Sequence, residues 1–222
     1  MITDARTLGG VFILRCDVCI VGAGPAGISI ARELGRRGLD VILLDSGGKK
    51  FDKAAHDLDK GTTSDSVSHG PLEDYRRRRL GGATTAWGGR CVPFDEIDFE
   101  PRDFVPHSGW PLRKRDLDPY YVRAHEYLEL GPYTYSARES LAGDAAEQPM
   151  IPGLRDPELT MDALYRFSPP TNFGTRFEQD LADSPNVRVL LHATAQELVL
   201  DRDGNTVERL TIVSTGGHKL TL

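Results

Sequence analysis

The sequence lacks an excess of basic residues, and it lacks any long apolar run. Lysine and arginine together number 27 against 33 aspartate and glutamate residues, which gives a formal net charge of −6. Proteins that bind nucleic acid are usually basic, so we expect no nucleic-acid partner. No stretch approaches the roughly 18 consecutive apolar residues that a membrane-spanning helix requires, so we also expect no membrane span.

The amino terminus lacks the features of a secretory leader. Residues 1–6 include an acidic residue, Asp4, and no apolar segment with a small-residue cleavage site follows them. The expected location is therefore cytoplasmic. The 222 residues, of which 39% are hydrophobic, suffice for one large domain or for one domain with a partial second.

Cysteine is scarce, and the three cysteines predict neither a metal site nor a disulfide. Cys16 and Cys19 have the C-x-x-C spacing that occurs in zinc and redox sites. However, Cys16–Val21 has the pattern of a buried strand, on which residues three apart face opposite sides. No second pair of ligands accompanies them, and the six histidines form no spaced cluster. We therefore predict no metal site and assign no catalytic residue.

What the sequence does contain is two glycine-rich segments, Val21–Gly27 (VGAGPAG) and Leu80–Gly89 (LGGATTAWGG). The first lies between a predicted strand at 16–21 and a predicted helix at 25–37 that ends at Gly38. A second buried strand is predicted at 41–44. This order predicts a βαβ unit, and hence a parallel sheet in a Rossmann-like α/β fold.

The glycines of the first segment have the G-x-G-x-x-G spacing that is typical of a dinucleotide site. Gly22 permits a tight turn, Gly24 lets a pyrophosphate approach the backbone, and Gly27 lets the helix pack closely on the strand. The first helical turn, at Pro25 and Ala26, offers unpaired N–H groups and the positive end of the helix dipole to the phosphates. The segment therefore predicts a dinucleotide-binding turn.

An acidic residue stands where such a site needs one. Asp45 follows the second strand, with Ser46 beside it, and is expected to accept hydrogen bonds from ribose hydroxyls. A carboxylate there disfavours a 2′-phosphate and hence NADP. Further along, four consecutive arginines at 76–79 point in several directions on any element, so most are expected to be solvated. Only Arg79, adjacent to the second glycine segment, is a candidate for cofactor binding.

The second glycine segment predicts that another backbone loop approaches the same cofactor. Its predicted backbone contacts are Gly81, Gly82, Ala83 and Gly88. Thr84 or Thr85 can donate a hydroxyl hydrogen bond. Trp87 can either border the cofactor ring or pack in the core, and both interpretations stay open.

The segment Leu80–Gly89 resembles the flavin-contacting loop of the glucose–methanol–choline (GMC) oxidoreductases, most of all the bacterial sugar-dehydrogenase branch and the pyranose oxidases. The same likeness continues in Ser108–Leu112 (SGWPL), Asp116–Tyr121 (DLDPYY) and Arg166–Gly174 (RFSPPTNFG). It extends over essentially the whole chain from Asp17. The motifs are specific in combination rather than one by one.

This resemblance implies FAD as the cofactor and a sugar or related alcohol as the substrate, whose CH–OH group is oxidised by hydride transfer to flavin N5. Some pyranose oxidases carry a histidine joined to the flavin where this chain has Ala86, so we expect non-covalent FAD. The resemblance also places the backbone of Ala195 against the adenine. The electron acceptor stays unknown.

The resemblance further implies an incomplete protein. GMC members are longer, and their catalytic histidine, with a second histidine or an asparagine, lies near the carboxyl terminus. We therefore expect an N-terminal portion that needs a missing C-terminal half or a partner chain for turnover. Two alternatives stay open: another Rossmann-type flavoprotein, such as a hydroxylase or reductase, and a non-catalytic flavin-binding module completed by a partner chain.

Three regions are expected along the chain. Residues 1–107 form the first part of the FAD-binding domain, 108–184 begin a substrate-facing region, and 185–222 form a β-meander of the FAD-binding domain. The meander is predicted from strands at 186–191, 196–201 and 207–213, with a hairpin turn at Asp203-Gly204. The tyrosine-rich stretch between 110 and 135 suits either a carbohydrate site or, residue by residue, simple packing.

Overall fold

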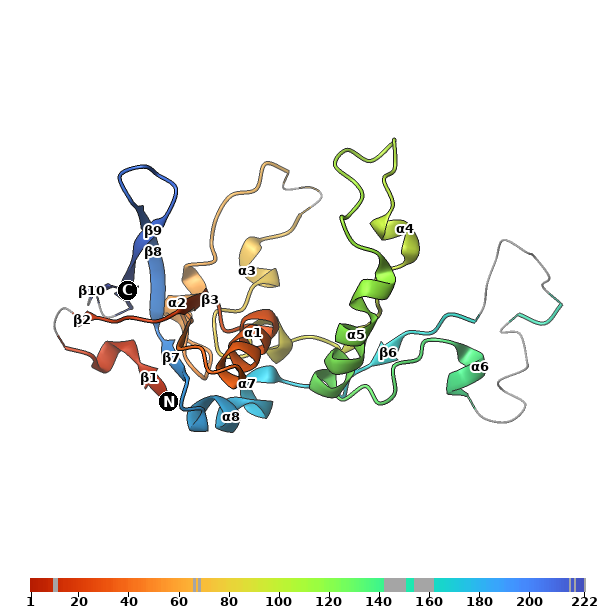
Figure 1. Cartoon of the computed structure of the whole chain (residues 1–222), viewed down its shortest axis with the longest axis horizontal. Coiled ribbons are helices and arrows are strands. Elements are labelled where there is room, and N and C mark those ends of the chain that lie inside the picture. Colours follow the sequence, from red (N-terminus) through yellow and green to blue (C-terminus); the bar gives the residue numbers. More distant parts are fainter. Residues whose placement is uncertain are drawn as a thin grey trace. The chain divides into compact units, whose positions relative to one another are not determined.

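A computed structural model describes residues 1–9, 12–65, 67, 69–141, 151–153, 162–215, 217 and 219–221. The chain forms two compact units (Figure 1). Unit 1 comprises residues 1–86 and 172–222, and unit 2 comprises residues 87–171. Each is described by itself below. The domain limits expected from the sequence, at 107/108 and 184/185, stay predictions.

Unit 1 is built on a parallel four-stranded sheet with the strand order β1-β7-β4-β3. The strands are β1 (Ile2–Asp4), β7 (Val187–Leu191), β4 (Val41–Leu44) and β3 (Val18–Val21). Helix α1 (Pro25–Arg36) connects β3 to β4, whose register pairs Val18 with Val41 and Val21 with Leu44. The predicted βαβ unit and the α/β fold class are therefore confirmed.

The local sequence sets both ends of α1. Pro25 occupies the first turn, where its missing N–H costs no helical hydrogen bond, and Gly24 is the N-cap. The helix ends at Arg36, one residue before the predicted limit. Gly38 follows with φ +85°, in the left-handed region that favours glycine. The chain can therefore turn back at once into β4.

The other elements of unit 1 form a second sheet and short helices. The second sheet has the order β2-β10-β9-β8, and β8 and β9 form a long antiparallel hairpin. Its strands are β2 (Phe12–Ile13), β8 (Ala193–Leu200), β9 (Val207–Ser214) and β10 (Lys219–Thr221). The helices are η1 (Ala5–Thr7), α2 (Lys53–Asp57), α3 (Leu72–Tyr75), η2 (Gly82–Thr85), α7 (Phe173–Arg176) and α8 (Glu178–Asp183).

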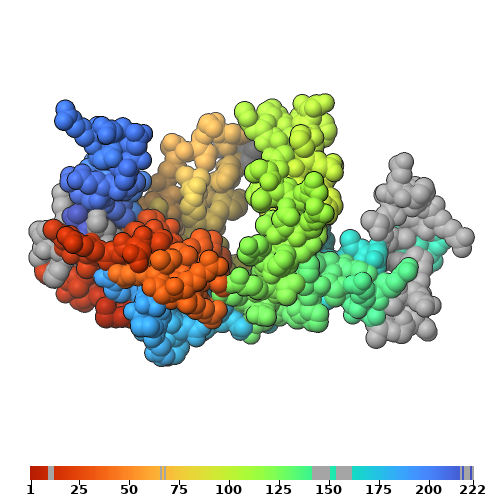
Figure 2. Space-filling model, in the orientation of Figure 1, coloured from red at the N-terminus to blue at the C-terminus, as the bar shows by residue number. Residues whose placement is uncertain are grey.

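The predicted meander needs a correction. The strand expected at 186–191 does not join it; as β7 it lies between β1 and β4 in the parallel sheet. The reason is visible in the burial of β7, where four of the five residues are buried, as a central parallel strand requires. The hairpin begins only at Ala193. Figure 2 shows it in blue, rising from the red and orange segments of the same unit.

The core of unit 1 lies on both faces of β4. Ile42 and Leu44 pack with Leu190, Leu210 and Ile212 on the face covered by the hairpin. Because side chains alternate along a strand, Val41 and Leu43 face the other side, where α1 contacts β4 and α8 contacts β7. All four β4 side chains are fully buried.

The expectation that Cys16–Val21 is a buried strand is wrong. In β3 exposed and half-buried residues alternate, Cys19 is exposed, and 62% of Val21 is exposed. Within the described part of the chain β3 pairs only with β4, so that one strand edge and part of one face stay open. The apolar run by itself does not reveal that the strand lies at an edge.

Among its described residues, unit 2 contains a short two-stranded sheet and three helices. Its elements are β5 (Arg90–Cys91), α4 (Glu96–Phe99), α5 (Lys114–Leu128), α6 (Ala137–Ser140) and β6 (Arg166–Phe167). Buried His125 lies against Tyr133 and Tyr135, with Nε2 3.1 Å from the Tyr135 hydroxyl, and Tyr121 stacks on Tyr133. For these residues the contacts support packing rather than a carbohydrate site.

In the described ranges no helix is both long and apolar enough to cross a membrane.

Ile42 provides a test of the core. We expect Ile42→Ala to lower the free energy of unfolding by about 2–5 kcal/mol, because it removes buried apolar surface and leaves a cavity. Ile30→Ala is the matched control, since 48% of Ile30 is exposed on α1, and its effect should stay below about 1 kcal/mol. Urea unfolding followed by circular dichroism measures both. Equal effects would contradict the proposed core.

Candidate functional site

The two glycine segments meet in unit 1. The Gly81 N–H donates to the Ala23 carbonyl oxygen at 2.8 Å. A Cβ added to Gly82 would lie 2.7 Å from the Cα of Gly24, closer than real side-chain contacts allow. A Cβ on Gly27 would overlap the Gly22 carbonyl oxygen. The absence of side chains at these positions therefore lets both loops and the start of α1 share one small volume.

The Asp45 carboxylate ties the first glycine turn to the loop that follows β4. Its Oδ2 accepts from the Ala23 N–H at 2.9 Å, and its Oδ1 accepts from the Gly47 N–H at 2.9 Å. The backbone of Asp45 also bonds to Leu190 and Ala193. Burial raises the pKa of the Asp45 carboxyl above its usual value, and the two backbone hydrogen bonds offset part of that rise.

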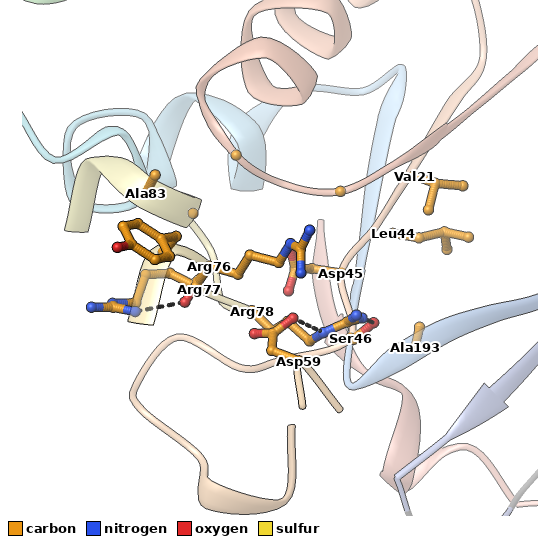
Figure 3. A pocket seen from close by; sticks show the side chains of 14 residues that line it. Val21, Leu44, Asp45, Ser46, Asp59, Arg76, Arg77, Arg78, Ala83 and Ala193 are labelled. Atoms are coloured by element: carbon orange, nitrogen blue, oxygen red, sulfur yellow. Dashed lines mark hydrogen bonds and ion pairs between the residues drawn. The ribbon is translucent and has the colours of Figure 1, made fainter. Parts of the chain in front are cut away.

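A pocket of about 400 Å³ opens at this junction (Figure 3). Its lining includes six of the predicted site residues, namely Gly22, Gly24, Asp45, Ser46, Gly82 and Ala83. They come from the turn after β3, the end of β4 and the start of η2. In a parallel sheet, ligands bind outside the carboxyl ends of the strands, which is where this pocket lies.

Other predicted residues lie beside the pocket and hold its loops. Arg79 donates through Nε to Thr85 Oγ1 at 2.7 Å, so its side chain stabilises the second glycine segment rather than extending into the pocket. The Thr84 hydroxyl is buried; it donates to the Gly81 carbonyl oxygen and accepts from the Phe173 N–H. Both hydroxyls thus already serve the loop itself. Pro25, Ala26, Gly27 and Gly81 belong to the same two loops without lining the pocket.

Three further predicted residues are not among those that line the pocket. Ala195 packs beside the core cluster under the hairpin, and Ala193, two residues earlier, lines the pocket. Trp87 and Gly88 belong to unit 2, where Trp87 Nε1 donates to the Thr171 carbonyl oxygen at 3.2 Å. The cofactor contacts predicted for these three residues stay predictions.

The sequence analysis missed part of the pocket wall. Arg76, Arg77 and Arg78 all line it, although most of the arginine run was expected to be solvated. Arg78 Nε donates to Asp59 Oδ1 at 2.6 Å, and its guanidinium also reaches Ser46 Oγ at 3.1 Å. Asp59 follows α2 in a polar stretch, and only 1% of its side chain is exposed. A polar stretch gives no local signal of such burial.

No three His, Cys, Asp or Glu side chains gather in the described ranges in a way that could hold a metal ion. Cys16, Cys19 and Cys91 are free thiols.

Sequence comparisons identify the kind of site. Residues 15–67 match the sequence profile of the family described as FAD binding domain. The 6‴-hydroxyparomomycin C oxidase of Streptomyces lividus is 30% identical over 116 residues, which cover 47% of this chain and 21% of that protein. Paromamine 6′-oxidase of Streptomyces fradiae is 31% identical over 116 residues, with the same coverage. The chain spans about a fifth of the length of these curated relatives.

Solved structures also align with the chain at low sequence identity. Pyridoxine 4-oxidase from Mesorbium loti is 18% identical with a TM-score of 0.49, covering 94% of this chain and 48% of its own. Formate oxidase from Aspergillus oryzae RIB40 is 18% identical with a TM-score of 0.47, covering 96% of this chain and 44% of its own.

Residues 15–67 therefore match an FAD-binding domain, and the cofactor of the chain is FAD. The pocket fits this cofactor. Its first glycine turn leads into α1, whose first N–H groups have no partner within the helix and suit a pyrophosphate. No side chain intrudes where Gly22, Gly24 and Gly82 line the pocket.

Gly82→Ala tests whether the two loops jointly form the site. The added methyl group would press on the Gly24 backbone, and φ +52° at residue 82 disfavours any side chain. We expect FAD affinity to fall at least about tenfold and the free energy of unfolding to fall by about 1–3 kcal/mol. Gly9→Ala is the control, because nothing lies within 4 Å of its added Cβ. Equal FAD affinity of both variants, measured by flavin fluorescence titration, would contradict the joint site.

Asp45→Asn tests the buried carboxylate through pH. Because the pKa of Asp45 is raised, the folded state holds its proton more tightly than the unfolded state does. The stability that this group contributes is present below 3.8, its usual pKa, and is lost as pH rises through the raised pKa. The free energy of unfolding of the wild type minus that of Asp45→Asn should therefore decrease from acidic pH to neutral pH in urea titrations.

Asp57 supplies a control with the opposite sign. Hydrogen bonds from Lys53 and Lys60 lower its pKa to about 2. The contribution of Asp57 is present above 3.8 and is lost as pH falls, so the wild type minus Asp57→Asn difference should increase with pH. A difference for Asp45 that is constant or increases with pH would contradict the raised pKa.

Proposed function

We propose that the chain is the FAD-binding portion of a GMC-type oxidoreductase that oxidises the CH–OH group of a sugar or related alcohol by hydride transfer to flavin N5. The observation that carries the proposal is the contact between the two glycine loops, Gly24 against Gly82, because the second loop is the segment that resembles GMC enzymes. The match of residues 15–67 to an FAD-binding family supports the cofactor half of the proposal.

The names of two relatives support the substrate half. One is an oxidase of 6‴-hydroxyparomomycin C, and the other is named as a 6′-oxidase of paromamine. The first name specifies a hydroxy compound as the molecule that is oxidised, which agrees with a CH–OH donor. Since the chain spans 21% of each relative, substrate and turnover are proposals about the whole protein.

In this proposal the chain's own residues bind and orient the cofactor. The turn at Gly22–Gly24 and the first turn of α1 hold the pyrophosphate, and Asp45 fixes that turn through the Ala23 N–H. The η2 loop presents the backbone of Gly82 and Ala83 to the same pocket. Bound FAD supplies a hydride acceptor. No histidine is among the described residues that line this pocket, and we assign no catalytic base there.

The first experiment is an absorbance spectrum of the purified chain after incubation with FAD and gel filtration. We expect the chain to retain the flavin and to release it on acid precipitation, as non-covalent binding requires. A chain that never retains flavin would overturn the proposal at its cofactor step. Flavin that stays with the acid-precipitated protein would contradict non-covalent binding.

A second measurement separates the function classes. Under anaerobic conditions, sugars and simple alcohols are added to the flavin-loaded full-length protein, and loss of the visible flavin absorbance reports reduction. The proposal expects reduction by a CH–OH donor and not by NADH or NADPH. Reduction by a nicotinamide instead would favour a hydroxylase or reductase.

A further inference from the structure

We propose that Asp59, held in place by Arg78, accepts a hydrogen bond from an adenosine ribose hydroxyl of the bound FAD. The inference rests on the FAD-binding step of the proposed function and adds a residue that the dinucleotide motif does not include. It starts from an unsatisfied atom. Asp59 Oδ2 is buried and has no hydrogen-bond partner among the described residues.

A buried carboxylate oxygen without a partner is costly, because removing charge from water needs compensating hydrogen bonds. Asp59 Oδ1 has such a partner, the Nε of Arg78 at 2.6 Å. His56 Nδ1 lies 4.0 Å from Oδ2, which is beyond hydrogen-bond distance. Since Asp59 lines the pocket, the inference is that a donor on the ligand supplies the missing hydrogen bond to Oδ2.

The position of Asp59 indicates which part of the ligand supplies that donor. Arg78 connects Asp59 to Ser46, which follows directly after β4. In a dinucleotide-binding βαβ unit the ribose lies at the end of the second strand, and the pyrophosphate lies at the glycine turn. Figure 3 shows Asp59, Arg78 and Ser46 together along one side of the pocket. A ribose hydroxyl is therefore the expected donor.

Asp59 differs from Asp45 in its hydrogen bonding. Each oxygen of Asp45, the predicted ribose ligand, accepts one backbone N–H, from Ala23 and from Gly47, and keeps a further lone pair for a ligand. Asp59 Oδ2 has no hydrogen-bond partner among the described residues, so a ribose hydroxyl would satisfy an acceptor that the chain leaves unpaired.

Arg78 acts as a positioning residue for Asp59. Its guanidinium spans Asp59, Ser46 and the Leu58 carbonyl oxygen. Its backbone is held as well, because a Cβ on Gly47 would overlap the Arg78 carbonyl oxygen. Because the ion pair occupies Oδ1, the inference assigns the ribose hydrogen bond to Oδ2.

Calorimetric titration of the 222-residue chain with ADP, 2′-deoxy-ADP, 3′-deoxy-ADP and IDP tests the inference without turnover. We expect the wild type to bind ADP at least about tenfold more tightly than one of the two deoxy analogues, as loss of a hydrogen bond to a charged acceptor predicts. In Asp59→Asn that ratio should fall to about twofold or less, since a neutral amide makes a weaker hydrogen bond. IDP, which lacks the adenine amino group, should bind the wild type about as well as ADP.

Asp57→Asn is the matched control, because Asp57 lies on α2 outside the pocket and pairs with Lys53 and Lys60. It should keep the wild-type ratio. Asp59→Glu is the second variant: it retains the charge and displaces the oxygen, so it should also lose the ratio even if Asp59→Asn fails to fold.

Three results would overturn the inference: equal binding of ADP and both deoxy analogues to the wild type, an unchanged ratio in the Asp59 variants, or discrimination against IDP alone. A parallel titration with FAD separates the two proposals. If FAD binds and the ratio is absent, only the ribose assignment fails. If FAD does not bind at all, the proposed function fails with it.

Discussion

The contact between two backbones without side chains is the constraint on which the site depends. Gly24 and Gly82 approach so closely that a single methyl group on Gly82 would force the loops apart. The Gly81 N–H donates to Ala23, which joins the loops at the same place. Because Gly24 is also the N-cap of α1, the position of the second loop is coupled to the start of the helix and through it to the parallel sheet. One close approach thus aligns three elements around the pocket.

Two buried carboxylates at the pocket, Asp45 and Asp59, have different hydrogen-bond partners. The carboxylate oxygens of Asp45 accept hydrogen bonds from backbone N–H groups, and these bonds hold the glycine turn against the end of β4. Asp59 pairs with Arg78 through Oδ1, and its Oδ2 has no hydrogen-bond partner among the described residues. Burying two acids near a site for a pyrophosphate is unfavourable by itself, but the arginines along the wall supply compensating positive charge.

The fold of the dinucleotide unit could be predicted from the sequence because its signals are local. An apolar run, a glycine turn, an amphipathic helix and a second apolar run follow one another within 30 residues, and each depends on neighbours in the chain. The pairing of β7 could not be predicted from the sequence. A short apolar strand is compatible with either sheet, and only tertiary contacts determine which sheet it joins. Asp59 and Arg78 were not predicted as pocket residues, because their positions also depend on tertiary contacts. Arg78 bonds to Asp59, 19 positions away in the sequence, and to Ser46, 32 positions away, and no repeating sequence pattern indicates either contact. Ala193 lines the pocket without having been predicted to do so, and the contact predicted for Ala195 stays a prediction.

Two neighbouring glycines, Gly47 and Gly48, show how the sheet and the pocket wall are joined. Gly47 allows the Arg78 carbonyl to approach, and the Gly48 carbonyl accepts from the Leu80 N–H at 3.0 Å. A Cβ on Gly48 would lie 2.5 Å from Nε2 of His192, the residue with φ +55° at which the chain leaves β7 for the hairpin. The His192 N–H in turn donates to the Gly47 carbonyl oxygen. A side chain at Gly47 would therefore displace the Arg78 backbone, and a side chain at Gly48 would displace His192 at the start of the hairpin. The site geometry thus depends on two glycines that the dinucleotide motif does not include.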